Sequence, residues 1–288
     1  MTYTETACAK LNLSLDIIRK RPDGFHDMRM VMQSIDLCDT VAVREQPGTE
    51  VSLDTSLAFL PKDGSNIAVK AANIFFREAA VAPRGLHITL DKRIPVCAGM
   101  AGGSSNGAAV LRLLRRLYAG EMPLTELERI AALVGSDVPY CVRGGTALAE
   151  GRGEILTDLP PLPPCWFVVC KPAFSISTPE LFSQVQVKKL RCHPDTAGMI
   201  TALHAGDLDG VAHRLYNVFE EVLPRKYAEV FTIKRLLLDR GALASSMTGS
   251  GPTVMGLFED RNTAASAAED LRTLYPSTFL AANTGKQV

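Results

Sequence analysis

A glycine- and serine-rich segment, residues 95–107, is the part of the sequence best suited to bind a ligand. Between Gly99 and Gly107 it holds four glycines and two serines, Ser104 and Ser105. It lies between a segment typical of a strand and one typical of a helix, where free N–H groups and the helix dipole attract anions such as phosphate. Glycine lets the backbone approach phosphate oxygens, and the hydroxyls can bond phosphate or hydrated Mg²⁺. The alternative is a tight turn in which Ser104 or Ser105 caps the helix. The segment matches neither the Walker A motif nor G-x-G-x-x-G, so the usual nucleotide-binding folds are disfavoured.

A second group of polar residues lies near the N-terminus. Residues 7–17 are apolar at odd positions, whereas Lys10, Asn12, Ser14 and Asp16 occupy even positions. A period of two predicts a strand, and we expect the four polar side chains to project together away from the core. Lys10 is then either a surface lysine or a cation that serves a nearby carboxylate.

Asp137 is the candidate carboxylate. It follows Gly135-Ser136 and precedes Val138-Pro139, so one interpretation is that its side chain caps a short helix. The other is that it acts as a general base that removes a proton from an attacking hydroxyl group.

Composition limits the class of protein. The chain has 288 residues, of which 47% are hydrophobic and 22% charged, as in a globular protein of one or two domains. A net charge of zero argues against binding nucleic acid or membrane through a bulk electrostatic field. There is neither an apolar run of the ~18 residues that a membrane span needs nor a signal peptide pattern, so we expect a cytoplasmic protein. The seven cysteines form no C-x-x-C pair and are expected to be reduced thiols.

The elements that must position these residues alternate irregularly along the chain, which indicates an α+β fold. The proline cluster at residues 160–164 is the best candidate for a domain boundary. A capping-box pattern at Thr125–Glu128 predicts the start of one helix. The periodicity predicts helices near 66–79, 108–118, 125–134, 178–187, 194–205, 207–221, 224–240 and 261–274, and strands near 41–44, 51–53, 86–90, 146–156, 166–170 and 278–283, with a strand pair around 249–252.

Residues 95–108 resemble the phosphate loop of the GHMP kinases, P-x₃-G-x-G/A-G-S-S-x-A, with one extra glycine. Ala9-Lys10-Leu11-Asn12 and residues 247–252 resemble two further motifs of that family, and the likeness extends in order across nearly the whole chain. The resemblance implies a two-domain GHMP kinase fold with the active site in the interdomain cleft. Residues 1–158 would carry the ATP phosphate loop and the catalytic Lys and Asp, and residues 159–288 the substrate side and the second glycine loop.

Residues 20–26, 135–139 and 144–154 resemble a narrower group of GHMP kinases. For this group the resemblance implies transfer of phosphate from ATP, with Mg²⁺, to the C2 hydroxyl of a cytidine diphosphate-linked methylerythritol, in the non-mevalonate route to isoprenoid precursors. Phe25 stands where the group often has Tyr, and Ser136 where it often has Ala. The alternatives are a homoserine or mevalonate type of GHMP kinase, for which a cytidine clamp has no purpose, and a catalytically silent relative.

The resemblance implies a role for each matching residue. Lys10 and Asp137 would be catalytic, and no metal ligand is firm beyond a contact from Ser104 or Ser105. ATP would contact Asn66, Lys92, Pro95, Ala98, Gly99, Met100, Ala101, Gly102, Gly103, Ser104 and Ser105. The acceptor substrate would contact Asn12, Phe25, His26, Asp137, Phe182, Thr248, Gly249 and Ser250.

Several of these residues also have a purely structural interpretation. Phe182 is typical of a core aromatic, His26 of a turn, and Asn66 of a helix cap. Lys92 fits a solvated strand end, and residues 248–250 fit a simple hairpin turn. We expect a monomer or weak homodimer that binds small molecules rather than nucleic acid or membrane.

Overall fold

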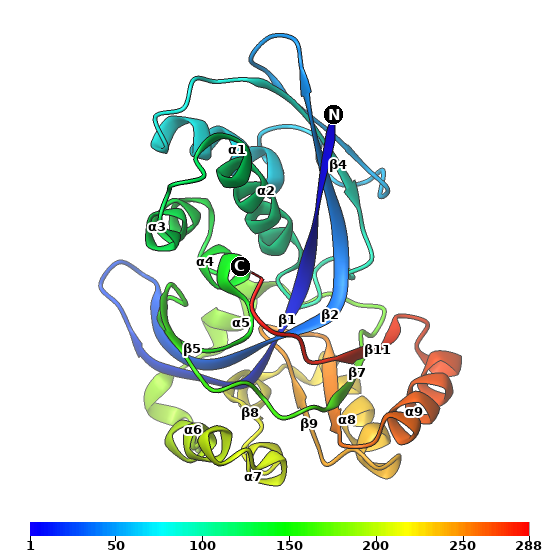
Figure 1. Cartoon of the computed structure of the whole chain (residues 1–288). Helices are drawn as coiled ribbons and strands as arrows, with labels where there is room; N and C mark the ends of the chain where they lie inside the picture. Colours follow the sequence, from blue (N-terminus) through cyan, green and yellow to red (C-terminus); the bar gives the residue numbers. More distant parts are fainter. Residues whose placement is uncertain (288) are drawn as a thin grey trace.

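The alternating segment near the N-terminus lies in a strand, β1 (Thr2–Lys20), which pairs with β2 (His26–Gln46) in a long antiparallel hairpin. The computed structural model describes residues 1–287 and builds a seven-stranded sheet around this hairpin (Figure 1). Its order is β3-β4-β2-β1-β8, with β5 paired to the other end of β2 and β6 paired to β5. Because β2 is long, it pairs with β4 near its C-terminal end and with β5 near the hairpin tip, and so connects the two parts of the sheet.

A second, four-stranded sheet has the order β11-β7-β10-β9. The remaining strands are β3 (Val51–Thr55), β4 (Gly85–Asp91), β5 (Thr146–Gly151), β6 (Ile155–Asp158), β7 (Trp166–Cys170), β8 (Tyr216–Asn217), β9 (Ala244–Met247), β10 (Val254–Phe258) and β11 (Thr278–Ala282). The α-helices are α1 (Ile67–Glu78), α2 (Gly102–Tyr118), α3 (Leu124–Val134), α4 (Val138–Arg143), α5 (Thr178–Gln184), α6 (Thr196–Ala205), α7 (Leu208–Ala212), α8 (Glu229–Asp239) and α9 (Arg261–Leu274).

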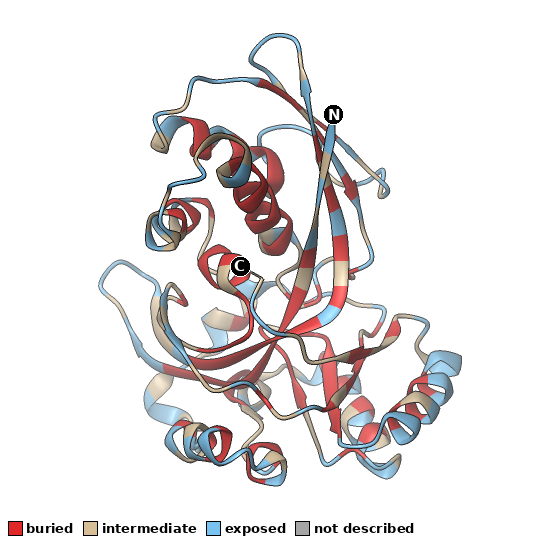
Figure 2. Ribbon diagram, viewed as in Figure 1, coloured by how far each residue is buried: buried red, intermediate tan, exposed pale blue. Residues whose placement is uncertain are grey.

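Helices cover one face of each sheet. In the first sheet α2 packs against β1 and β2, and α1 and α4 pack against α2. In the second, α8 packs on β9 and β10, and α9 on β7 and β11. Helices α1, α8 and α9 bury one face and expose the opposite one, as amphipathic helices do, whereas α2 is buried on all sides along residues 105–114 (Figure 2). None of the helices in residues 1–287 has both the length and the apolar character that a membrane crossing needs.

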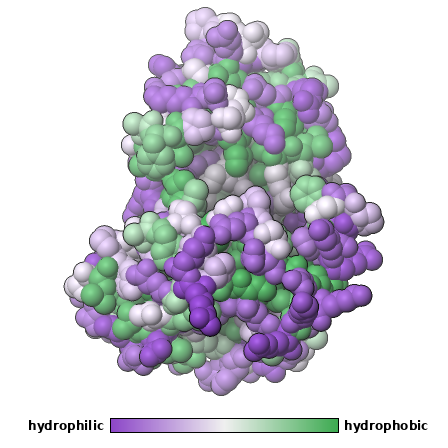
Figure 3. Space-filling model, turned by 180° about the vertical axis from the view of Figure 1, so that it is seen from behind, coloured by the Kyte–Doolittle hydropathy of each residue, from purple (hydrophilic) through white to green (hydrophobic). Residues whose placement is uncertain are grey.

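These features confirm the α+β fold class, whereas the division at residue 158 stays a prediction. The two parts interlock, because β8 extends the first sheet beside β1 and Asn283 forms a bridge with Ile35 of β2. The surface seen from behind is a mosaic of hydrophilic and hydrophobic side chains (Figure 3).

One prediction about β1 is wrong. Lys10, Asn12, Ser14 and Asp16 do not project into solvent: each is at most 5% exposed. The register of β1 against β2 shifts between Cys8 and Lys10 and again between Asn12 and Ser14, which interrupts the regular alternation of the strand. In addition, distant segments pack along β1: the Lys10 N–H donates to the Met100 carbonyl at 3.2 Å and the Asn12 N–H to the Thr248 hydroxyl at 2.9 Å.

Other local predictions need correction. The helix expected at 108–118 begins earlier, at Gly102, and the one expected at 207–221 is only the short α7, followed by β8 and a 3₁₀ turn. The segment 146–156 is a hairpin of two strands. The capping box does not form, because α3 has no side-chain cap and the Glu128 carboxylate instead accepts two hydrogen bonds from Arg143.

The cysteines also differ from expectation. Cys8 and Cys38 face each other across β1 and β2 and form a disulfide, so the prediction of reduced thiols throughout is wrong for this pair. Cys141, Cys165 and Cys170 are free and buried. Their burial raises the pKa of each thiol, to about 12 for Cys141 and Cys165. Such thiols stay protonated and unreactive.

Candidate active site

A cavity of about 1200 Å³ lies between the two glycine loops and the tip of the β1–β2 hairpin. Pockets for a single small ligand usually measure roughly 300–1,000 Å³, so this cavity has room for two ligands side by side. Most residues predicted for the site line it: Lys10, Asn12, Phe25, His26, Asn66, Lys92, Pro95, Ala98, Gly99, Ala101, Gly102, Gly103, Ser104, Asp137, Phe182, Gly249 and Ser250. Met100, Ser105 and Thr248 are buried and are not part of its lining.

The loop before α2 is built to leave that helix open at its N-terminus. Cys97 and Ala101 adopt the left-handed conformation, with φ of 53° and 57°, although neither is glycine. Strained backbone of this kind concentrates at functional sites. Ala101 is the N-cap and forms no side-chain cap bond, so a ligand can take the place of the missing cap.

The two serines have different surroundings. Ser104 lines the cavity, whereas the Ser105 hydroxyl is buried and donates to the Cys8 carbonyl oxygen at 2.7 Å. Ser105 therefore fastens the start of α2 to β1. The interpretation of either serine as N-cap is wrong, since that position belongs to Ala101.

The two glycine loops touch backbone to backbone. A Cβ atom on Gly99 would lie 2.4 Å from the Thr248 carbonyl oxygen, and one on Gly249 would lie 2.5 Å from the Gly99 carbonyl oxygen. Real Cβ atoms do not approach so closely. The glycines at these two positions thus let the second loop close against the first, and the 248–250 segment is more than a hairpin turn.

A buried cluster around Asp39 joins the residues just before the phosphate loop to helix α2 after it. One oxygen of this fully buried carboxylate accepts the backbone N–H groups of Arg93 and Ile94, at 2.7 and 2.8 Å. The other accepts from Lys92 Nζ and from Asn106 Nδ2 of α2. Since the Lys92 side chain is only 4% exposed, its interpretation as a solvated strand end is wrong.

The interpretation of Asn66 as a helix cap is confirmed, and its contact with ATP stays a prediction. Its side-chain oxygen accepts the Ala68 N–H at 3.0 Å and so caps α1, and its side-chain nitrogen donates to the Pro61 carbonyl oxygen at 2.8 Å. It also lines the cavity, as Lys92 does. A residue held by two hydrogen bonds of this kind offers a ligand a fixed surface.

Lys10, Asn12 and Asp137 meet on one wall of the cavity. Lys10 Nζ donates to Asn12 Oδ1 at 2.6 Å and lies 4.0 Å from Asp137 Oδ2. Asp137 occupies the N-cap position of α4 but makes no side-chain cap bond, so the capping interpretation is wrong. Its side chain is 35% exposed and Lys10 only 5%, which leaves a carboxylate open to a ligand with a buried ammonium group behind it. That arrangement suits proton abstraction from a hydroxyl group.

Aromatic rings form a clamp at the other end of the cavity. His26 and Phe182 stack with ring centroids 5.0 Å apart, and Phe182 packs edge-on against Phe219 at 4.9 Å. Phe25 is 53% exposed at the hairpin tip. Burial, and then the nearby charge of Lys20, lowers the pKa of His26. The imidazole ring is therefore neutral at pH 7, as suits stacking against a flat ligand.

Two features of the site escape sequence reasoning. Asp39 sits in an alternating strand segment with no local motif, and its partners come from residues more than fifty positions away. Thr178 at the start of α5 shares a hydrogen bond of 2.7 Å with Ser250, which links α5 to the second glycine loop. Within residues 1–287 no group of three or more His, Cys, Asp or Glu side chains is arranged to hold a metal ion.

Comparison with known proteins agrees with this geometry. The family model for the GHMP kinases N-terminal domain matches residues 66–145, and that for the GHMP kinases C-terminal domain matches residues 199–277. A crystal structure of homoserine kinase from Cytophaga hutchinsonii matches with a TM-score of 0.76 over 99% of this chain and 95% of its own. At 18% identity that likeness shows the fold alone. Fold, phosphate loop and family models together show that the chain belongs to the GHMP kinases.

Relatives with higher sequence identity identify one group within the GHMP kinases. The 4-diphosphocytidyl-2-C-methyl-D-erythritol kinase of Alkaliphilus metalliredigens is 43% identical over 94% of this chain and 93% of the relative. A crystal structure of 4-(cytidine 5'-diphospho)-2C-methyl-D-erythritol kinase is 30% identical, with a TM-score of 0.83 over 98% of this chain and 100% of that structure. Within the GHMP kinases the chain belongs to the 4-diphosphocytidyl-2-C-methyl-D-erythritol kinases.

Proposed function

We propose that the chain transfers the γ-phosphate of ATP to the C2 hydroxyl of 4-diphosphocytidyl-2-C-methyl-D-erythritol, in the non-mevalonate route to isoprenoid precursors. The observation that carries this proposal is the placement of Lys10, Asn12 and Asp137 on one wall of the cavity, between the phosphate loop and the aromatic clamp. The order along the cavity is that of the reaction: nucleotide phosphates, reacting hydroxyl, nucleobase.

ATP takes the side of the cavity formed by Asn66, Lys92 and the phosphate loop. The loop and the uncapped N-terminus of α2 offer N–H groups to the phosphates, so binding needs no net positive charge on the protein. Mg²⁺ would enter with ATP and would offset the charge of its phosphates. Hard oxygen donors suit it, and the Ser104 hydroxyl is the protein group that we assign beside it.

The acceptor binds with its cytosine between Phe25, His26 and Phe182 and its C2 hydroxyl beside Asp137. Asp137 accepts the hydroxyl proton as the oxygen attacks the γ-phosphorus, and the bond between that phosphorus and the β–γ bridging oxygen breaks to release ADP. Lys10 donates to Asn12 and directs its remaining N–H bonds at the phosphoryl oxygens in transfer, which gain negative charge.

The same site argues against homoserine or mevalonate as acceptor. Neither has a planar group to stack on the aromatic surface that Phe25, His26 and Phe182 form. A silent relative would lack the base or the loop, and both are present here. A monomeric or weakly dimeric protein in the cytoplasm remains our expectation from the sequence.

Release of ADP from ATP and Mg²⁺ tests the proposal directly. We expect turnover with the cytidylyl substrate and background rates with homoserine and mevalonate. Turnover of either control acceptor, with none of the cytidylyl substrate, would refute the assignment.

A further inference from the structure

The turn that joins β5 to β6 lies beside the catalytic carboxylate. It consists of Gly151-Arg152-Gly153-Glu154, in which both glycines have positive φ, 67° and 114°. A Cβ atom on Gly153 would lie 3.8 Å from Asp137 Oδ1 and 3.3 Å from Cε of Met30. The backbone of this turn is therefore part of the wall around the reacting hydroxyl, although the reaction described above makes no use of it.

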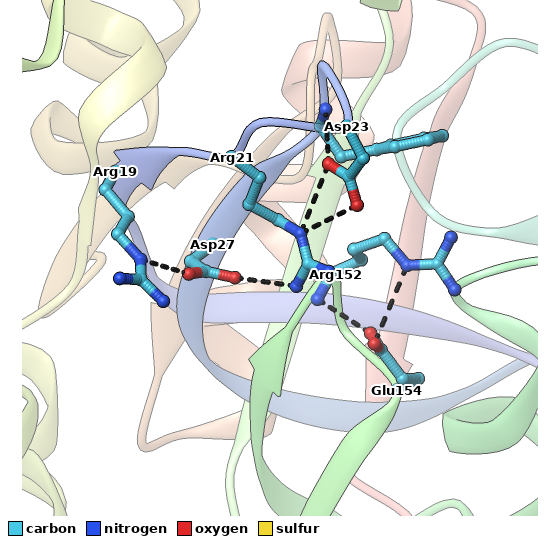
Figure 4. A network of polar contacts seen from close by, with 7 residues as sticks. Arg19, Arg21, Asp23, Asp27, Arg152 and Glu154 are labelled. Atoms are coloured by element: carbon cyan, nitrogen blue, oxygen red, sulfur yellow. Dashed lines mark hydrogen bonds and ion pairs between the residues drawn. The ribbon is translucent and has the colours of Figure 1, made fainter.

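The Arg152 side chain reaches from this wall to the aromatic clamp. Its guanidinium lies over the Phe25 ring, with Cζ 5.2 Å from the ring centroid, and the residue lines the cavity. The carboxylate of Glu154 binds mainly the backbone of Arg152. One of its oxygens accepts the Arg152 backbone N–H at 2.6 Å, and the other lies 3.6 Å from Arg152 Nε (Figure 4). Within residues 1–287 the guanidinium thus has an ion pair longer than a hydrogen bond and N–H groups left for a ligand.

The other arginines near the hairpin tip are already satisfied. Arg19 donates to Asp27, and Arg21 bonds Asp27 at 3.0 Å and Asp23 at 3.0 Å (Figure 4). Neither lines the cavity, and the Arg19 side chain is 76% exposed. In Figure 4 the Arg152 guanidinium points away from this network. Arg152 is the arginine among residues 1–287 that faces the cavity.

The acceptor substrate carries a diphosphate between its nucleobase and its polyol. If the base lies in the clamp and the polyol beside Asp137, that diphosphate must cross the span that Arg152 covers. Among the cations that line the cavity, Lys10 serves the reacting groups and Lys92 is held by Asp39, so Arg152 and Lys20 remain for this charge. The planar fork of a guanidinium matches phosphate oxygens in pairs, and its opposite face can stay on an aromatic ring.

We propose that Arg152 binds the diphosphate of the acceptor and so sets specificity for a nucleoside diphosphate-linked polyol. This inference rests on the proposed function. It assigns a task to the β5–β6 turn: its glycines bring the chain close to Asp137, and the arginine between them holds the substrate at its charged centre. Phe25 then has two contacts, the nucleobase and the guanidinium.

The test compares Arg152→Gln and Arg152→Lys with wild type. Arg29→Gln is the matched control, because Arg29 of β2 forms an exposed ion pair with Glu150 of β5, close to the turn, and lies outside the cavity. Loss of a charge-assisted contact of this kind should raise KM for the cytidylyl substrate about 10- to 100-fold in Arg152→Gln. Arg152→Lys should recover part of that loss, and the KM for ATP and the melting temperature should stay at wild-type values in all three variants.

Binding of cytidine 5'-diphosphate and of cytidine, measured by calorimetry, isolates the diphosphate. Arg152→Gln should weaken binding of the diphosphate by a similar factor and leave cytidine unchanged. An equal loss for both ligands, or none for either, overturns the inference while the proposed function stands. Absence of wild-type turnover of the cytidylyl substrate would overturn the proposed function and this inference with it.

Discussion

Replacing Asp39 by Asn should loosen the phosphate loop without changing the shape of the core. The amide can keep one oxygen toward the N–H groups of Arg93 and Ile94, but its NH₂ group then faces Lys92 Nζ and Asn106 Nδ2, which are both donors. The variant therefore leaves a buried ammonium without its counter-charge. Breaking a buried ion pair on one side costs about 3–5 kcal/mol of folding free energy.

For a chain of this size that loss corresponds to a drop in melting temperature of roughly 6–20 °C, at about 2–4 °C per kcal/mol. Because the cluster joins the strand before the loop to α2 after it, KM for ATP should rise as well, whereas KM for the cytidylyl substrate should change little. Thermal unfolding followed by circular dichroism, with ATP titrations at saturating acceptor, measures both effects.

Two further variants make the test specific. Asp54→Asn removes an exposed carboxylate of β3, in the same sheet as Asp39. This carboxylate accepts a hydrogen bond from Lys62, and its loss should leave the melting temperature unchanged. In the double variant Asp39→Asn/Lys92→Met the stranded charge is gone, so part of the lost stability should return. A melting temperature for Asp39→Asn within about 2 °C of wild type, with unchanged KM for ATP, would refute this account of the cluster.

Three further predictions concern the reacting groups, the clamp and the contact between the loops. Asp137→Asn should lower kcat by at least ~10² with little change in ATP binding, and an unchanged kcat would exclude Asp137 as the base. Because the pKa of His26 is lowered, its ring is neutral above pH 6.5 and becomes protonated only as the pH falls through the lowered pKa. The neutral ring suits stacking on the base, so KM for the cytidylyl substrate should rise as that protonation occurs. His26→Gln should abolish the rise in KM, and a rise that persists in this variant would assign it to another group. Gly249→Ala places a Cβ 2.5 Å from the Gly99 carbonyl oxygen and should lower kcat and the melting temperature, whereas Gly120→Ala, which has open space, should change neither; equal behaviour would contradict the loop contact.

Where the sequence predicts well, the signal is local. The period of two in residues 7–17 and the helical period in residues 261–274 predict that β1 is a strand and α9 a helix, because both patterns lie within a few consecutive turns or residues of the chain. The phosphate loop is recognisable for the same reason, since glycines and serines beside a helix start are contiguous in the chain. The family resemblance then supplies the roles that spacing cannot.

Where it fails, the cause is a contact between distant segments. The sequence predicts that Lys10 and Asn12 face solvent, because it does not show that the distant residues Met100 and Thr248 lie against this part of β1. The sequence predicts Ser105 as a phosphate ligand, because no neighbouring residue indicates that its hydroxyl donates a hydrogen bond to the Cys8 carbonyl oxygen. For the same reason the local sequence does not identify Asp39 as a functional residue. Nor does it predict that Arg152 lies over the ring of Phe25, because the two residues are more than a hundred positions apart.

In the proposed reaction a phosphoryl group moves from ATP to the polyol of an intact cytidylyl substrate. Phosphorus-31 NMR of the reaction of the purified protein with ATP, Mg²⁺ and that substrate measures this directly. We expect a new phosphomonoester resonance, equal in amount to the ADP formed, with the diphosphate resonances of the substrate unchanged. ADP accompanied by inorganic phosphate and an unmodified substrate would contradict the account.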